Sequence, residues 1–192
     1  MVKNRRGAKG AKKQYSALLV ACQGTVTEPA YLNMLKTHFR APAITIWAKA
    51  KDPVKLVKEV SQKVNKEEFD RAFVLIDVDD SPADQIQQAI SLSRKSKRPI
   101  ELIVSNECFE VWLLAHFRRV DNALGRSQLT HRLISAGAVL AKNPKVLASD
   151  FPIEGFDKAD KNVDTVDPNT LGRRGSTAMP AVVKELQRRS QR

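Results

Sequence analysis

Five consecutive apolar residues, Ala72 to Ile76, limit the choice of fold more than anything else in the sequence. A strand that helices cover on both faces is apolar at every position, whereas a half-exposed strand alternates apolar and polar residues. Further apolar runs are separated by segments with apolar residues at helical spacing; the runs lie at 16–22, 44–48 and 99–104, and the helical segments at 27–39, 52–64 and 81–96. The sequence therefore predicts a three-layer α/β domain with a mainly parallel four-stranded sheet.

The second part of the chain has a different pattern. Helical spacing predicts a mainly helical C-terminal part with helices at 109–117, 127–140 and 180–189. Residues 141–178 are rich in Pro, Gly, Asn and Asp and are interpreted as irregular. We divide the chain into a basic N-terminal arm at 1–14 and a single domain at 15–192, with a core at 15–117 and a helical or irregular extension at 118–192.

The formal net charge is +12, and nearly all of it lies near the two ends of the chain. Residues 1–13 contain six Lys or Arg and no acid, and residues 173–192 contain six Lys or Arg and one acid. Two basic ends favour a polyanion, DNA or RNA, bound through its phosphates, although basic tails also serve as solvated segments. The expected nucleic-acid contacts are Arg5, Arg6, Lys9, Lys12, Lys13, Arg173 and Arg174.

Apolar runs in this sequence are short. None approaches the ~18 residues of a membrane helix, and the longest, at 17–22, is too short for the apolar region of a secretory signal. We therefore expect a cytoplasmic protein without a membrane partner. Cys22 and Cys108 lie in apolar surroundings without C-x-x-C spacing, which favours buried, reduced thiols over a disulfide or a zinc site.

Three polar segments directly follow predicted strands, at 23–29, 77–80 and 105–110. Because the carboxyl ends of parallel strands meet at one edge of a sheet, these segments are expected around one crevice. Asp77 and Asp79 point the same way in extended backbone, so they can share a hard cation that relieves their mutual repulsion. Glu28, after a glycine turn and at the start of a helix, can be aimed at the same metal.

Each segment also has a purely structural interpretation. Glu28 suits the positive end of its helix, and Asp80 or Ser81 can cap the next one. Asn106 and Glu107 can cap the helix near residue 109. The isolated aromatic and histidine side chains are interpreted as structural, namely His38, Trp112, His116 and Phe117. Walker, Rossmann, nucleophile-elbow and zinc-ligand motifs are missing from the sequence, which disfavours P-loop and serine-hydrolase chemistry.

A set of motifs runs in order through nearly the whole chain: Arg5-Arg6-Gly7, Cys22-Gln23-Gly24-x-x-Thr27-Glu28-Pro29-x-Tyr31, Asp77-Val78-Asp79-Asp80, Ser105-Asn106-x-Cys108-Phe109-Glu110-x-Trp112-Leu113-Leu114-x-His116-Phe117, and Ser176-Thr177. As a set, these motifs resemble the RloB-like proteins. The resemblance implies a Toprim-type fold, the metal-binding α/β domain shared by topoisomerases, bacterial primases and OLD-family nucleases. It also implies an association with bacterial restriction and anti-phage defence.

In Toprim proteins a glutamate after the first strand and an Asp-x-Asp after a later strand hold Mg²⁺ and assist phosphoryl transfer. The resemblance thus implies Mg²⁺ or Mn²⁺ as cofactor, with Gln23, Glu28, Asp77 and Asp79 as metal ligands and the last three as catalytic residues. Gln23 stands where the family usually has glutamate, and its amide offers an oxygen without charge or basicity. Around these ligands we expect Asp80, Asn106 and Glu110, which would not bind the metal themselves.

The predicted function is a Mg²⁺-dependent, Toprim nuclease-like protein of bacterial phage defence that acts on nucleic-acid phosphodiesters. One alternative is a catalytically weakened or inactive module that binds nucleic acid or senses an effector, and Gln23 favours it. Another is a subunit whose helical part docks a partner protein of the defence system. The sequence assigns no oligomeric state.

Overall fold

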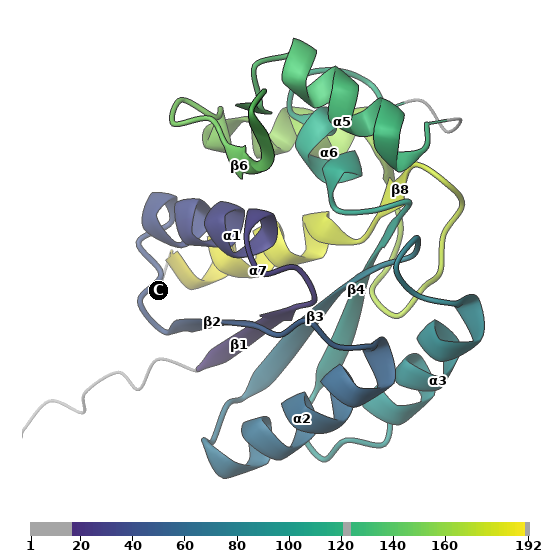
Figure 1. Cartoon of the computed structure of the whole chain (residues 1–192). Helices are drawn as coiled ribbons and strands as arrows, with labels where there is room; N and C mark the ends of the chain where they lie inside the picture. The colour runs from purple at the N-terminus through teal and green to yellow at the C-terminus, as the bar shows by residue number, and fades with distance from the viewer. Residues whose placement is uncertain (1–16, 121–123, 191–192) are drawn as a thin grey trace, which may run out of the picture.

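The structure is a computed structural model that describes residues 17–120 and 124–190. In chain order, the strands of its central sheet are β1 (Leu18–Cys22), β2 (Ile44–Ala48), β3 (Arg71–Asp77), β4 (Ile100–Asn106), β7 (Asp164–Thr165) and β8 (Ser176–Thr177). They lie in the order β2-β1-β3-β4-β8-β7 (Figure 1). The first four strands are parallel, β8 runs antiparallel to β4, and β7 is parallel to β8.

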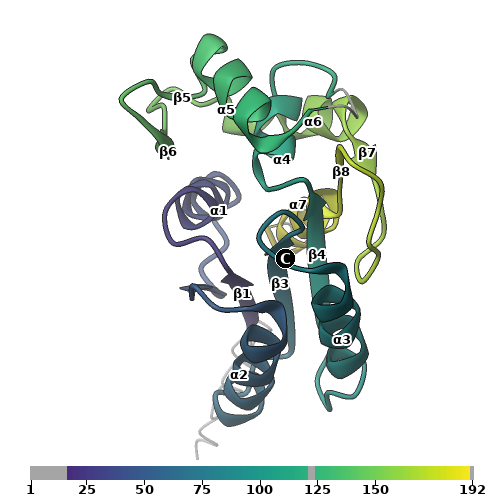
Figure 2. The same cartoon turned by 45° about the vertical axis from the view of Figure 1, so that its right-hand side comes forward.

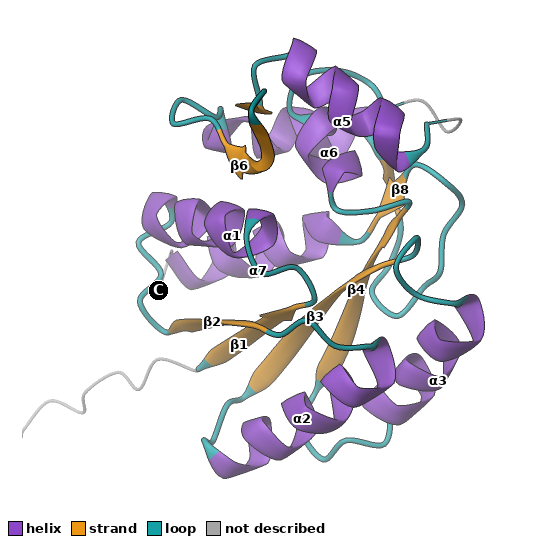
Figure 3. Ribbon diagram, viewed as in Figure 1, coloured by secondary structure: helices purple, strands orange, loops and turns teal. Residues whose placement is uncertain are grey.

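Helices cover both faces of this sheet (Figure 3). One face carries α1 (Thr27–His38) and α7 (Met179–Ser190), and the other carries α2 (Pro53–Lys66) and α3 (Ala83–Ser93). The mixed α/β architecture expected from the sequence is therefore confirmed. Among the helices, α2 shows most clearly how it starts, because the Asp52 carboxylate accepts a hydrogen bond from the Lys55 N–H at 2.9 Å and Pro53 fits the first turn.

The apolar side chains of the strands pack into two separate cores. Leu18 and Val20 point to the α1 and α7 side, while Leu19 and Ala21 point to the α2 side. All four side chains are fully buried, and burial of each leucine or valine contributes roughly 1.5–3 kcal/mol. Because alternate residues enter different cores, the strand must be apolar throughout, as the unbroken run in β3 also shows.

A smaller layer lies beyond the carboxyl ends of β1, β3 and β4 (Figure 2). It consists of α4 (Glu110–Ala115), α5 (Arg126–Ser135), the antiparallel pair β5 (Val139–Leu140) and β6 (Asn143–Leu147), a 3₁₀ turn at Ile153–Gly155, and α6 (Phe156–Asn162). Its apolar side chains join the core between α1 and α7. This layer therefore closes over the edge of the sheet at which the predicted site residues end.

Three parts of the sequence-based prediction differ from the structure. The central sheet has six strands instead of four, because β7 and β8 are two-residue strands, too short to leave a periodic signal. Residues 141–178 are not irregular throughout, since they contain β6, α6, β7 and β8. The helix expected at 127–140 ends at Ser135, because Gly137 adopts a positive φ of 69° and terminates it.

The basic arm predicted at 1–14 lies outside the described residues. Within residues 17–120 and 124–190, no helix combines the length and the apolar character needed to cross a membrane.

Candidate functional site

The end of β1 is joined to the end of β3 by the side chain of Gln23. Its Oε1 accepts a hydrogen bond from the Asp77 backbone N–H at 3.1 Å. Its Nε2 donates to the Lys51 carbonyl at 2.9 Å and to the Ser81 hydroxyl at 3.3 Å. The amide oxygen expected to weakly ligate a metal therefore already holds the backbone of a predicted ligand in place. Ser81, expected as a possible helix cap, receives this bond instead, and α3 has no side-chain cap.

The Glu28 carboxylate folds back over Gly24 at the start of α1. A Cβ atom at Gly24 would lie 1.9 Å from both carboxylate oxygens, so only glycine permits this approach. Glu28 is 7% exposed. Burial raises the pKa of Glu28, the backbone N–H groups of Glu28 and Gly24 oppose the rise, and the charge of Glu110 adds to it. Backbone contacts thus position the Glu28 carboxylate, while its burial disfavours the ionised form.

Three aspartates lie together at the end of β3. Carboxylate oxygens of Asp77, Asp79 and Asp80 all lie within 4.8 Å of one another. The carbonyl of Glu107 fixes this turn, because it accepts hydrogen bonds from the backbone N–H groups of Val78 at 3.1 Å and of Asp79 at 3.0 Å. The turn after β3 is therefore tied to the turn after β4, and the carboxylates are held close despite their like charges.

The pKa values of two of these aspartates reflect that crowding. Burial raises the pKa of Asp77 well above its ordinary value, and the charges of Glu28, Glu110 and Asp79 raise it further. Burial raises the pKa of Asp79 to about 6, although Arg126 opposes this rise. In both cases the protein lacks enough positive charge nearby to make ionisation easy.

The positive charge that the cluster does have comes from Arg126, the first residue of α5. Its Nε lies 2.6 Å from Asp79 Oδ2, and its Nη2 lies 3.0 Å from Asp80 Oδ2 and 3.5 Å from Asp77 Oδ2. Nη1 donates to Asp80 Oδ1 at 3.3 Å. One guanidinium therefore contacts all three carboxylates of the cluster.

A cavity of about 460 Å³ lies between these groups. Its acidic lining consists of Glu28, Asp77, Asp80 and Glu110, and its basic lining of Arg126 and Lys145. The wall formed by β6 is tied to α1, because the Thr27 hydroxyl donates to the Lys145 carbonyl at 2.9 Å. Thr27 therefore helps to close the cavity, and the N-cap position of α1 belongs to Val26, which makes no side-chain capping bond.

The donor chemistry of the cluster fits a hard divalent cation. All candidate donors are carboxylate oxygens, the ligands that Mg²⁺, Mn²⁺ and Ca²⁺ prefer. The raised pKa values of Asp77 and Asp79 indicate that added positive charge would stabilise their ionised forms. Asp77, Asp79 and Asp80 are therefore the residues that could hold such an ion. Asp80, which the sequence placed beside the metal, belongs to the cluster itself, and Glu28 and Glu110 line the same cavity.

A family model described as RloB-like protein matches residues 18–186. The chain belongs to the RloB-like protein family. The matched region runs from β1 into α7, so it contains every residue that lines the cavity. No curated protein and no solved structure matched the chain.

Not every predicted site residue of this RloB-like chain reaches the cavity. The Asn106 side chain turns away and donates to the Gly172 carbonyl at 2.8 Å. Glu107 does not cap α4, because it pairs with Arg174 at 2.8 Å. Arg173 pairs with Asp164 at 2.7 Å. The two arginines expected to contact nucleic acid are thus partly neutralised by internal carboxylates. Their expected companions at positions 5, 6, 9, 12 and 13 lie outside the described residues.

Sequence reasoning missed Arg126 and Lys145. Both lie in the extension, far along the chain from the Asp-x-Asp motif, and no local motif marks them. Gly125 precedes Arg126 at the start of the helix, and its backbone N–H donates a hydrogen bond to Gln128 Oε1 at 3.1 Å. This is a local helix-start signal, but it says nothing of a neighbouring strand end. Only the fold, which places α5 across the end of β3, connects them.

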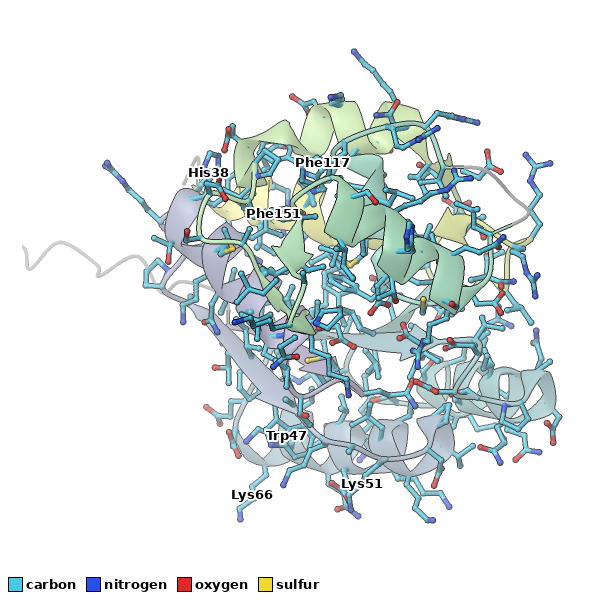
Figure 4. The ribbon with its side chains drawn as sticks, turned by 45° about the horizontal axis from the view of Figure 1, so that its top comes forward. His38, Trp47, Lys51, Lys66, Phe117 and Phe151 are labelled. Atoms are coloured by element: carbon cyan, nitrogen blue, oxygen red, sulfur yellow. The ribbon has the colours of Figure 1, made fainter. Side chains whose placement is uncertain are left out.

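His116 and Trp112 are buried structural residues. His116 accepts or donates a hydrogen bond with the Tyr31 hydroxyl at 3.0 Å, and its other ring nitrogen lies 3.0 Å from the Pro152 carbonyl. Burial lowers the pKa of His116 to about 4, so the ring is neutral at pH 7. Figure 4 shows Phe117 and Phe151 next to each other in the same layer, with ring centroids 5.6 Å apart. This cluster supports α1 and α4 behind the cavity.

Both cysteines are buried free thiols. Burial and the nearby charges of Glu28 and Asp77 raise the pKa of Cys22 to about 12, so its thiol stays protonated. Burial also raises the pKa of Cys108. Neither thiol therefore has the thiolate character that a nucleophile or a zinc ligand requires.

Proposed function

We propose that this RloB-like protein is a Mg²⁺- or Mn²⁺-dependent, Toprim nuclease-like protein of bacterial phage defence that acts on nucleic-acid phosphodiesters. The observation that carries the proposal is the convergence of carboxylates from two neighbouring parallel strands. Glu28 follows β1, Asp77 and Asp79 end or follow β3, and Glu28 and Asp77 line one cavity. Such a group of acids at the carboxyl edge of a parallel sheet is a fitting place for a hard cation.

The Toprim-type pattern that the RloB-like resemblance implies supports the same proposal. A Toprim domain has a glutamate after its first strand and an Asp-x-Asp after a later one, and Asp77 and Asp79 match the second element. Gln23 occupies the position of the first, but its side chain is engaged by Asp77, Lys51 and Ser81. We therefore assign the missing carboxylate to Glu28, which Gly24 allows to approach closely.

Each group of the site has a defined task in this proposal. A cation held by Asp77, Asp79 and Glu28 would neutralise charge on a phosphodiester and acidify water. Lys145 and Arg126 are the basic groups that line the cavity and can face phosphate oxygens. The basic ends of the chain retain the polyanion through its phosphates, in a salt-dependent way.

Nuclease assays with matched variants test the proposal. The protein is incubated with plasmid DNA, single-stranded DNA and RNA in Mg²⁺ or Mn²⁺, beside Asp77→Asn and Asp84→Asn. Asp84 is exposed in the first turn of α3, so the second variant makes the same change of charge away from the cavity. We expect the Asp77 variant to be at least about 100-fold slower and the Asp84 variant to match the wild type. Equal cleavage by all three proteins would refute the proposal.

A second candidate function is a non-catalytic module that binds nucleic acid or senses an effector, alone or with a partner protein. It is favoured by Arg126, whose guanidinium gives the aspartate cluster a cation of its own. The variant Gln23→Glu separates the two. A large gain of metal-dependent cleavage indicates a weakened nuclease, whereas unchanged cleavage together with salt-sensitive binding of nucleic acid supports the binding module.

A further inference from the structure

Arg126 reaches the aspartate cluster from a separate element of the chain. It is the first residue of α5, and its guanidinium nitrogens lie 2.6 Å from Asp79, 3.0 Å from Asp80 and 3.5 Å from Asp77. The side chain remains 44% exposed, so it is not locked in a closed core. These contacts make Arg126 an internal counter-ion that solvent can still reach.

A divalent cation would need the same oxygens. Mg²⁺ and Mn²⁺ bind carboxylate oxygens directly and replace hydrogen-bond donors at those atoms. The guanidinium contacts every carboxylate of the cluster, so the ion and Arg126 cannot both use the full set. Binding of the ion must therefore displace Arg126 from at least part of it, and removal of Arg126 must favour the ion.

The displaced guanidinium would stay at the cavity. Its backbone is fixed at the start of α5, where the Gly125 N–H donates to Gln128 Oε1 at 3.1 Å. Arg126 lines the cavity together with Thr130 of the same helix, and Lys145 stands in the wall formed by β6. Within the described part of the chain, Arg126 and Lys145 are the basic residues that line the cavity. A helix N-terminus adds a further positive potential there.

A guanidinium at this place is suited to a phosphate. Its planar fork can form two parallel hydrogen bonds to phosphate oxygens, which the ammonium of lysine cannot match. The carboxylates that it leaves repel a phosphate unless a cation covers them. The same exchange would thus make two phosphate-binding groups available: the metal ion on the aspartates and the free guanidinium beside it.

We propose that Arg126 is the phosphate-binding residue of this site and that it rests on Asp77, Asp79 and Asp80 until a divalent cation displaces it. This inference rests on the proposed function, since it takes the aspartates as the cation site. It assigns to one side chain two successive roles, first as a competitor of the cation and then as a ligand of the substrate phosphate.

The first measurement is the affinity for Mn²⁺ alone, by electron paramagnetic resonance of the free ion. The variant Arg126→Gln is compared with wild type, with Arg126→Lys, and with Arg132→Gln, which removes the same charge further along α5. We expect Arg126→Gln to bind Mn²⁺ at least about fivefold more tightly, because the competitor is gone. Arg126→Lys should lie in between, and Arg132→Gln should match the wild type.

The second measurement is the binding of thymidine 5′-phosphate by calorimetry, with and without Mn²⁺. We expect wild type to bind the nucleotide only with Mn²⁺, and Arg126→Gln to bind it about tenfold more weakly although it holds Mn²⁺ more tightly. Opposite changes in the two affinities are the signature of the exchange. A protein that was merely damaged by the substitution would lose both.

Each other outcome has a defined meaning. If wild type and Arg126→Gln bind Mn²⁺ with equal affinity, this inference is overturned while the proposed function stands. If nucleotide binding is unchanged in Arg126→Gln, the phosphate role is overturned. If none of the four proteins binds Mn²⁺, the proposed cation site itself fails, and this inference fails with it.

Discussion

The substitution Asp79→Asn is expected to stabilise the metal-free protein at neutral pH. Asp79 has a folded-state pKa of about 6 against an ordinary value of 3.8, because burial opposes its charge more than Arg126 supports it. A group whose pKa is raised on folding stabilises the protein when it is protonated. That contribution is complete below pH 3.8 and is lost as the pH rises through about 6. Asparagine avoids the loss because it never ionises.

The size of this effect follows from the shift. Two pKa units correspond to roughly 3 kcal/mol, and partial exposure of the aspartate cluster to solvent screens this to about 1 kcal/mol. For a chain of this length, about 1 kcal/mol moves the melting temperature by about 2–4 °C. We therefore expect Asp79→Asn to melt about 2–4 °C above wild type at pH 7.5 in a chelator, and at the same temperature as wild type near pH 4.

Differential scanning calorimetry of wild type, Asp79→Asn and the exposed control Asp84→Asn checks this expectation. The difference between variant and wild type is the decisive quantity, because groups remote from the aspartate cluster titrate in both proteins alike. Addition of Mg²⁺ should then stabilise wild type more than Asp79→Asn, which reverses their order. A lower melting temperature of Asp79→Asn at pH 7.5 without metal would refute the reasoning, since the pair with Arg126 would then outweigh the cost of burial.

Three further predictions follow from other parts of the structure. Gly24→Ala should displace the Glu28 carboxylate and weaken Mn²⁺ binding about tenfold, whereas Gly155→Ala, where a new Cβ meets only His116 at 3.5 Å, should leave it unchanged in the same titration. His116→Ala should lower the free energy of unfolding by about 2–4 kcal/mol in urea titrations. Because burial lowers the His116 pKa to about 4, the stability that the neutral ring provides should fall as the pH drops from 6.5 towards 4. If the variant and wild type showed the same dependence of stability on pH, this prediction would be contradicted. Removal of residues 1–14 should reduce the salt dependence of nucleic-acid binding, measured by fluorescence anisotropy, more than Arg173→Ala with Arg174→Ala, because internal carboxylates already pair with those two arginines; an equal reduction would show that the pairs open on binding.

The central strands could be predicted because their signal is local. Residues 72–76 are all apolar, and burial in two different cores explains each of them. The start of α2 at Asp52 and Pro53 could be predicted for the same reason, since capping involves neighbours in sequence. The short strands β7 and β8 could not, because two residues carry no period. In addition, β8 pairs with β4, more than 60 positions away in sequence, and β7 joins the sheet only through β8.

The site was predictable only where it follows the strands. Asp77, Asp79 and Glu28 directly adjoin β3 or begin α1, so the parallel topology alone brings them to one edge. Arg126 and Lys145 come from the extension, and their place depends on how α5 and β6 pack across that edge. The family pattern predicts a ligand at Gln23 from its position in the motif alone. Its three hydrogen bonds, which bind turns rather than a metal, are visible only in three dimensions.

The position of α7 at the end of the sequence affects folding during synthesis. Val182, Val183 and Leu186 complete the apolar layer that also contains Leu18, Phe73 and Ile103, although more than 75 residues separate the two groups in sequence. During synthesis on the ribosome, the strands therefore emerge with one apolar face exposed to solvent. That face stays exposed until residue 186 has been added. Truncated proteins that end before Met179 should aggregate or require a chaperone, even though they retain the residues of the candidate site.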